Sequence, residues 1–156
     1  MLHDRANVTE SVQTDAQVPT RRHILVVEDN DADVFLLKEA IALHKLNVGV
    51  HVVENGALAI SYIESIDGNP VSDGPCLCLL DMNLPLRSGP EVLRHLRRSQ
   101  RLAAIPAIVM TSSRSQTERE EIMRLGASAY FHKPITYGEF MDIGNVLRCF
   151  LPASHA

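Results

Sequence analysis

The chain has 156 residues, of which 46% are hydrophobic and 22% are charged, and its formal net charge is −4. This length suits a single domain, and the composition excludes a chain that is disordered throughout. The acidic balance and the lack of a long basic run argue against a nucleic-acid-binding surface, because phosphate binding needs clustered Lys and Arg. No apolar stretch reaches the roughly 20 residues that cross a bilayer, and the start lacks the pattern of a signal peptide.

The two ends of the chain differ in character from the middle. Residues 1–22 are polar and aperiodic, so we expect a flexible N-terminal tail. Residues 23–151 are expected to form one domain, residues 152–156 are expected to form a short C-terminal tail, and we expect no output domain. Cys76 and Cys78 lie in one apolar run, which favours buried reduced thiols and a cytoplasmic protein.

From His23 onward, short apolar runs alternate with helical patterns. In chain order the sequence predicts a strand at 23–27, a helix at 31–45, a strand at 49–53, a helix at 56–66, a strand at 76–80, a helix at 91–99, a strand at 105–110, a helix at 116–125, a strand at 128–132 and a helix at 139–151. Strands that are apolar on both faces are buried between helix layers. The order therefore predicts an α/β fold with a doubly wound, five-stranded parallel sheet, which places its site outside the carboxyl ends of the strands.

Polar side chains follow four of the predicted strands. Glu28 and Asp29 come after the first strand, and Asp81 comes after the third. Thr111 follows the fourth strand, and Lys133 follows the fifth. Any one of these residues alone is better explained as a helix cap, a turn residue or a solvated charge. Because the carboxyl ends of parallel strands meet at one edge, we expect all of them to converge.

Three carboxylates that share one pocket repel one another, and a divalent cation removes that repulsion. Magnesium prefers oxygen ligands and commonly uses one or two carboxylates together with a phosphate. Lys133 adds a positive charge that suits an anion, and an aspartate such as Asp81 can form an aspartyl-phosphate. The combination predicts a site that holds a phosphoryl group on a carboxylate with the help of Mg²⁺.

These motifs resemble the receiver domains of two-component response regulators. They are Val26–Asn30, Leu79–Pro85 with Gly89 beyond, Val109–Ser112 and Lys133-Pro134, and the resemblance covers about residues 23–151. It implies a flavodoxin-like (βα)5 receiver fold and a protein that is not an enzyme in the usual sense. Such a regulator takes a phosphoryl group from a sensor histidine kinase and signals by a conformational change to protein partners or by phosphorelay.

Carried onto this sequence, the resemblance implies that Asp81 accepts the phosphoryl group. Glu28, Asp29 and Asp81 would hold the Mg²⁺, and the backbone carbonyl of Asn83 would complete the protein ligands. The loop at 86–89 departs from the family, in which an acidic or amide residue often precedes the glycine. This departure bears on loop dynamics and not on phosphorylation.

The same resemblance implies a switch. Lys133 would pair with one phosphoryl oxygen, and Thr111 would hydrogen-bond another once the site is phosphorylated. Tyr130 matches the aromatic residue that turns inward when Thr111 moves, although a static, half-buried Tyr130 is the alternative. The resemblance also implies a cis bond between Lys133 and Pro134.

Asp33, residues 83–85 and the long loop at 67–75 look most like stand-alone regulators paired with phytochrome-type histidine kinases. We expect the kinase to dock on the first helix, where Phe35 lies off the core-facing arc, and on the loop after Lys133. We expect a homodimer through the fourth helix, fifth strand and fifth helix, with Val146 and Phe150 at its edge. The alternative is that neighbouring segments of the same chain cover these two residues.

Three other functions remain open at this stage. A phosphatase of the haloacid dehalogenase type needs a second acid two residues after its nucleophile, where this chain has Asn83. A flavodoxin-like carrier binds the FMN phosphate after its first strand, where Glu28 and Asp29 would repel it. A receiver that has lost phosphorylation and acts only as a binding module would keep the same fold.

Overall fold

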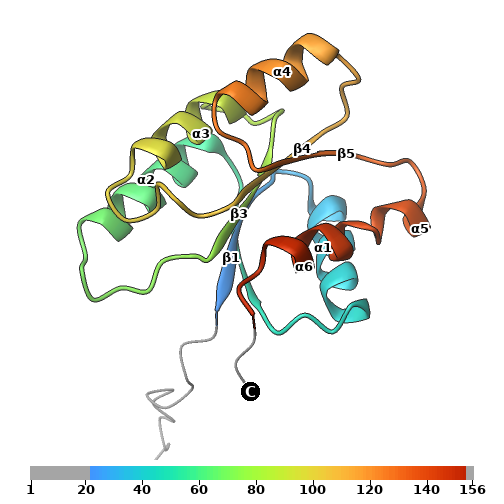
Figure 1. The fold of residues 1–156 in the computed structure, drawn as a ribbon, viewed down its shortest axis with the longest axis horizontal. Helices are drawn as coiled ribbons and strands as arrows, with labels where there is room; N and C mark the ends of the chain where they lie inside the picture. The colour runs from blue at the N-terminus through green and yellow to red at the C-terminus, as the bar shows by residue number, and fades with distance from the viewer. Residues whose placement is uncertain (1–21, 154–156) are drawn as a thin grey trace, which may run out of the picture.

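The computed structural model describes residues 22–153. Its elements in chain order are β1 (His23–Val27), α1 (Asp31–Leu43), β2 (Gly49–Val53), α2 (Gly56–Asp67), β3 (Leu77–Asp81), α3 (Gly89–Arg98), β4 (Ala107–Thr111), α4 (Gln116–Arg124), β5 (Ala129–His132), α5 (Tyr137–Phe140) and α6 (Ile143–Phe150) (Figure 1). Within this part of the chain, no helix is long and apolar enough to cross a membrane.

All five strands pair in parallel, in the order β2-β1-β3-β4-β5. The order reverses direction at β1, so successive crossovers cover opposite faces of the sheet. Helices α2, α3 and α4 lie on one face, and α1, α5 and α6 lie on the other (Figure 1). The predicted doubly wound, five-stranded parallel sheet is therefore confirmed.

Alternation along the strands divides the core into two layers. Leu25, Val27 and Leu80 face α2, α3 and α4, whereas Ile24 and Leu79, which alternate with them, face α1, α5 and α6. Every residue of β3 and β4 is buried, as expected for central strands covered on both faces. Cys78 is one of these buried residues and is a free thiol, whose pKa burial raises to about 12.

Side-chain caps fix where the helices begin. The side chains of Asn30, Asn55, Ser88, Ser115 and Thr136 accept hydrogen bonds from backbone N–H groups in the first turn of α1, α2, α3, α4 and α5 respectively. Because each helix starts soon after a strand ends, all five helix starts lie along the carboxyl edge of the sheet.

The last helix differs from the prediction of one helix over residues 139–151. The structure has α5 and α6 instead, separated at Met141 and Asp142. The ring of His44, at the end of α1, donates a hydrogen bond from Nε2 to the carbonyl of Met141 over 2.9 Å. Gly144 lies so close to this ring that a Cβ there would meet His44 Cδ2 at 2.0 Å. The break therefore falls where the chain packs tightly against His44.

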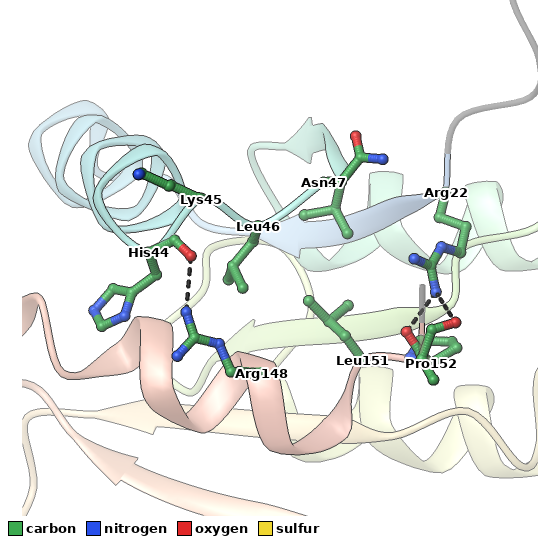
Figure 2. Close-up of a pocket in the computed structure, with 10 residues that line it drawn as sticks. Arg22, His44, Lys45, Leu46, Asn47, Arg148, Leu151 and Pro152 are labelled. Atoms are coloured by element: carbon green, nitrogen blue, oxygen red, sulfur yellow. Dashed lines mark hydrogen bonds between the residues drawn. The ribbon is translucent and has the colours of Figure 1, made fainter. Parts of the chain in front are cut away.

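Arg148 and Arg22 each donate hydrogen bonds to backbone carbonyls of distant segments (Figure 2). Arg148 donates to the carbonyl of His44 over 2.8 Å and so joins α6 to the end of α1. Arg22 donates to the carbonyls of Pro152 and Ala153, which places the first and last described residues side by side. Apart from Arg22, the predicted N-terminal tail lies outside the described residues, as do the last three residues of the predicted C-terminal tail.

Candidate phosphoacceptor site

The polar residues predicted at the strand ends converge at the carboxyl edge of the sheet. One carboxylate oxygen from each of Glu28, Asp29 and Asp81 lies within 4.8 Å of the others. Glu28 and Asp81 are buried, with 5% and 4% of their surface exposed, while Asp29 is exposed. The position of this cluster follows from the register, in which Val27 of β1 pairs with Leu80 of β3 just before both strands reach their acids.

Lys133 lies among the carboxylates. Its Nζ is 3.1 Å from Glu28 Oε2, 3.1 Å from Asp81 Oδ2 and 2.8 Å from Asp33 Oδ2. Burial disfavours its charged form, but the hydrogen bond to Asp33 and the negative charges of Glu28 and Asp81 outweigh burial and raise the pKa of Lys133 above its ordinary value. Lys133 is therefore a permanent positive charge beside Asp81.

The carboxylates also accept hydrogen bonds from the backbone, which fixes their orientation. Glu28 Oε1 accepts from the N–H of Asn30 over 3.1 Å, and Asp81 Oδ1 accepts from the N–H of Asn83 over 3.1 Å. Burial, and next its interaction with Asp81, raises the pKa of Glu28 to about 8. The cluster therefore contains more carboxyl groups than the single positive charge of Lys133 can neutralise.

This donor set fits a divalent cation of the hard, oxygen-binding kind. Three carboxylates that share one small volume, two of them buried, resist full ionisation unless positive charge is added. Mg²⁺ and Mn²⁺ both take carboxylate oxygens. The described residues contain no other group of three or more His, Cys, Asp or Glu side chains with metal-ligand spacing.

One prediction about the backbone is wrong. No peptide bond between residues 22 and 153 is cis, so the bond between Lys133 and Pro134 is trans. Lys133 reaches Glu28, Asp33 and Asp81 with this geometry, because its N–H bonds to the carbonyl of Thr111 over 2.8 Å and its long side chain spans the remaining distance.

Thr111 ends β4, where it pairs with His132 of β5, and Tyr130 of β5 pairs with Val109 of β4. Thr111 is fully buried, and its hydroxyl donates to Glu118 Oε1 of α4 over 3.4 Å and accepts from the N–H of Ser113 over 3.0 Å. Tyr130 is half-buried, its hydroxyl donates to the carbonyl of Ser113 over 3.0 Å, and the guanidinium of Arg119 lies 5.4 Å from its ring centre. Both predicted switch residues thus contact α4 or the loop that leads into it.

The structure adds two residues to the site that the strand ends did not reveal. Asp33, in the first turn of α1, makes the shortest contact of Lys133, and Glu118 bonds the hydroxyl of Thr111. An acid in the first turn of a helix is ordinarily explained by the helix dipole, so neither position carried a distinctive signal. In the sequence, Asp33 is indicated only by the family resemblance.

The family model described as "Response regulator receiver domain" matches residues 24–144. The chain belongs to this family. The receiver is 33% identical over 114 residues to the probable methanogenesis regulatory protein FilR2 of Methanothrix harundinacea, covering 73% of each chain. It is 30% identical over 110 residues to the response regulator Rcp1 of Synechocystis, covering 70% of this chain and 75% of Rcp1.

Solved structures of response regulators superpose on this chain. The phosphorylated cyanobacterial phytochrome response regulator RcpA superposes with a TM-score of 0.74 at 29% identity, covering 84% of this receiver and 94% of RcpA. The Mn²⁺-bound form of Rcp1 has a TM-score of 0.73 at 27% identity, covering 85% and 99%. The bacteriophytochrome response regulator RtBRR has a TM-score of 0.70 at 30% identity, covering 87% and 82%.

These relatives confirm the resemblance to receiver domains and to phytochrome-associated regulators. Family membership sets aside the phosphatase and flavodoxin alternatives. It does not by itself separate a receiver that is phosphorylated from one that only binds partners, because both have this fold.

Proposed function

We propose that this protein is a stand-alone response regulator that accepts a phosphoryl group on Asp81 from a histidine kinase in a reaction that depends on Mg²⁺. The observation that carries the proposal is the position of Asp81. Its carboxylate is 3.1 Å from Lys133 Nζ and belongs to the same cluster as the carboxylates of Glu28 and Asp29. Among the described residues, Asp81 is the member of this cluster that lies within the middle strand β3, whereas Glu28 and Asp29 follow β1.

In the proposed transfer, a carboxylate oxygen of Asp81 attacks the phosphorus of a phosphohistidine. The new O–P bond forms as the P–N bond breaks, and the bonding pair and a proton stay with the leaving imidazole. Lys133 offsets the negative charge that gathers on the phosphoryl oxygens. Bound Mg²⁺, held by Glu28, Asp29, Asp81 and the carbonyl of Asn83, would neutralise further charge.

We infer that the output of the regulator is a change in shape and not a chemical product. Thr111 and Tyr130 are the residues that would transmit it, because they connect the site to α4 through Glu118, Arg119 and the carbonyl of Ser113. The effect would pass to protein partners in the cytoplasm or onward by phosphorelay. The similarity to phytochrome regulators makes a bacteriophytochrome the kinase to try first.

Exposed apolar side chains flank the site where the kinase would dock. Phe35 of α1 is 61% exposed, and Ile135, two residues after Lys133, is 98% exposed. Tyr137 joins the two segments, because its hydroxyl donates to Glu39 of α1 over 2.8 Å. We propose that α1 and the loop after Lys133 form the kinase-binding surface.

The test is phosphorylation by a small phosphodonor, followed by mass spectrometry of the intact protein. With Mg²⁺, the wild type should gain the mass of one phosphate, and with EDTA it should not. Asp81→Asn keeps the shape and removes the nucleophile, so it should gain none. Asp29→Ala should also gain none while unfolding at a similar urea concentration, because Asp29 is exposed and contributes little to the core. A wild type that never gains phosphate would favour a receiver that acts only by binding.

A further inference from the structure

The hydroxyl of Thr111 is already occupied in this structure. It donates to Glu118 Oε1 over 3.4 Å, a long contact with a charged acceptor. Thr111 is fully buried at the end of β4, and Glu118 is half-buried in the first turn of α4. In the described structure the hydroxyl of Thr111 therefore donates toward α4.

A threonine hydroxyl has one proton to donate. The same proton therefore cannot serve Glu118 and a phosphoryl oxygen on Asp81 at once. The oxygen of Thr111 is also fixed, because it accepts from the N–H of Ser113 over 3.0 Å. Any new acceptor at Asp81 must compete with Glu118 for this proton.

The first turn of α4 also contacts Tyr130, the second proposed switch residue. Arg119, the neighbour of Glu118, places its guanidinium 5.4 Å from the ring centre of Tyr130. The turn begins at Ser115, whose Oγ accepts from the N–H of Glu118 over 3.2 Å. A displacement of Glu118 would therefore move Arg119 and loosen its contact with Tyr130.

We propose that Glu118 is a latch that holds the receiver in its unphosphorylated form by taking the hydroxyl of Thr111. The inference rests on the proposed function of Asp81. When a phosphoryl group forms on Asp81, it takes the proton, and the carboxylate of Glu118 is left without its donor. Glu118 then moves outward with the first turn of α4, and Arg119 leaves the ring of Tyr130. Glu118 is a positioning residue, because it acts through Thr111 and touches no reacting atom.

The test compares Glu118→Ala with the wild type. Removing the acceptor frees Thr111 to bind the phosphoryl group, so phosphorylation by a small phosphodonor with Mg²⁺ should be faster by roughly twofold to fivefold, the effect of one modest hydrogen bond. Without donor, backbone amide NMR signals of residues 111–119 should shift part of the way toward their positions in the phosphorylated wild type. Glu118→Met, which keeps the length of the side chain and also lacks the acceptor, should behave alike.

The matched control is Glu121→Ala, which removes the same charge from an exposed position of α4, whereas the hydroxyl of Thr111 bonds Glu118. It should match the wild type. Glu118→Gln retains an acceptor oxygen, so its phosphorylation rate should equal that of Glu121→Gln. In a Thr111→Ala background, Glu118→Ala should have no further effect, because the latch has nothing left to hold.

The outcomes separate the two proposals. If the wild type and Glu121→Ala are phosphorylated at the same rate as Glu118→Ala, and the NMR signals of Glu118→Ala do not move toward the phosphorylated form, the latch is wrong and the phosphoacceptor function stands. If the effect of Glu118→Ala persists in Thr111→Ala, it does not act through Thr111, and the latch is again wrong. If the wild type gains no phosphate, the proposed function fails and the latch fails with it.

Discussion

Leu86 has a backbone conformation that a leucine rarely adopts. Its φ angle is 68°, and it lies between β3 and α3, five residues after Asp81. Left-handed backbone costs a residue with a Cβ roughly 1–2 kcal/mol. The side chain is 75% exposed, so its packing returns little of that cost. The strain is therefore held by the loop around it, beside the proposed phosphoacceptor.

Leu86→Gly should consequently be neutral or stabilising, by up to about 1 kcal/mol in the free energy of unfolding. Glycine removes the strain, and its greater freedom in the unfolded chain takes back about 0.5–1 kcal/mol. Leu43→Gly is the control, because Leu43 ends α1 and is 62% exposed. Urea denaturation should show Leu43→Gly losing stability. A similar loss in Leu86→Gly would mean that the loop needs this side chain.

At the level of single residues, the sequence could predict the part of the site that lies at strand ends. Asp81 and Lys133 are found there because a parallel sheet gathers its carboxyl ends. Asp33 and Glu118 could not be found in this way, because they project from helices whose orientation depends on packing. In the sequence, an acid in the first turn of a helix is the same whether or not the folded chain gives it a side-chain partner.

Between elements, the contact of α1 with α6 depends on a glycine. A Cβ at Gly144 would meet the ring of His44, and that ring also bonds the carbonyl of Met141. Gly144→Ala should therefore destabilise the protein by about 1–3 kcal/mol, the usual cost of overpacking. Gly138→Ala is the control, because a Cβ at Gly138 in α5 meets nothing within 4 Å. It should be neutral or slightly stabilising.

Combining Gly144→Ala with His44→Ala distinguishes a clash from a general intolerance of α6. The second change removes the ring that the new methyl group meets, so the double variant should lose less stability than the two single losses together, by at least about 0.5 kcal/mol. Urea denaturation of the four proteins measures this difference. Additive losses would show that His44 is not what restricts residue 144.

The elements themselves were predictable, and their ends were predicted less well. All five strands and the first four helices lie where the alternating pattern placed them, and β1 and β2 match residue for residue. The fourth strand was expected from residue 105 and begins at Ala107, since the two residues before it, Ile105 and Pro106, belong to the preceding loop. The break between α5 and α6 lies at a contact with His44, which is 97 positions before Met141, so local sequence patterns could not indicate it.

For the molecule as a whole, the proposed kinase-binding surface can be tested through Phe35. Phe35→Ala should slow phosphoryl transfer from a histidine kinase that phosphorylates the wild type, by about fivefold or more if Phe35 is an anchor worth over 1 kcal/mol. Phosphorylation by a small donor should not change. Leu43→Ala alters an equally exposed residue at the opposite end of α1 and should affect neither rate. Equal slowing with both donors would place the defect in the site and not in docking.

Self-association is the second property at this scale. Val146 and Phe150 are only partly buried and pack against the core beneath α6, so the same chain covers them in part. Met123 of α4 is 43% exposed on the proposed dimer face. We expect a homodimer in sedimentation, with Met123→Asp and Phe150→Asp shifting it toward monomer. Phosphodonor with Mg²⁺ should change its strength, because Tyr130 adjoins this face.

Val71→Asp is the control for this experiment, because it adds the same charge at a residue that is 87% exposed in the loop before β3. It should leave association unchanged. Met123→Asp keeps the test decisive if Phe150→Asp disturbs the core. A wild type that remains monomeric at high concentration, with and without phosphodonor, would rule out the dimer.

The bond of Arg22 to the carbonyls of Pro152 and Ala153 has a consequence for engineering. Arg22 precedes β1, so this junction lies at the amino ends of the strands, opposite Asp81 (Figure 1). Cargo fused at either border would leave the edge that carries Asp81 clear. The two borders are also near enough for a short linker, so a circular permutant could be opened at the exposed loop around Val71. The new ends of such a permutant would lie between α2 and β3, where the receiver could be inserted into another protein.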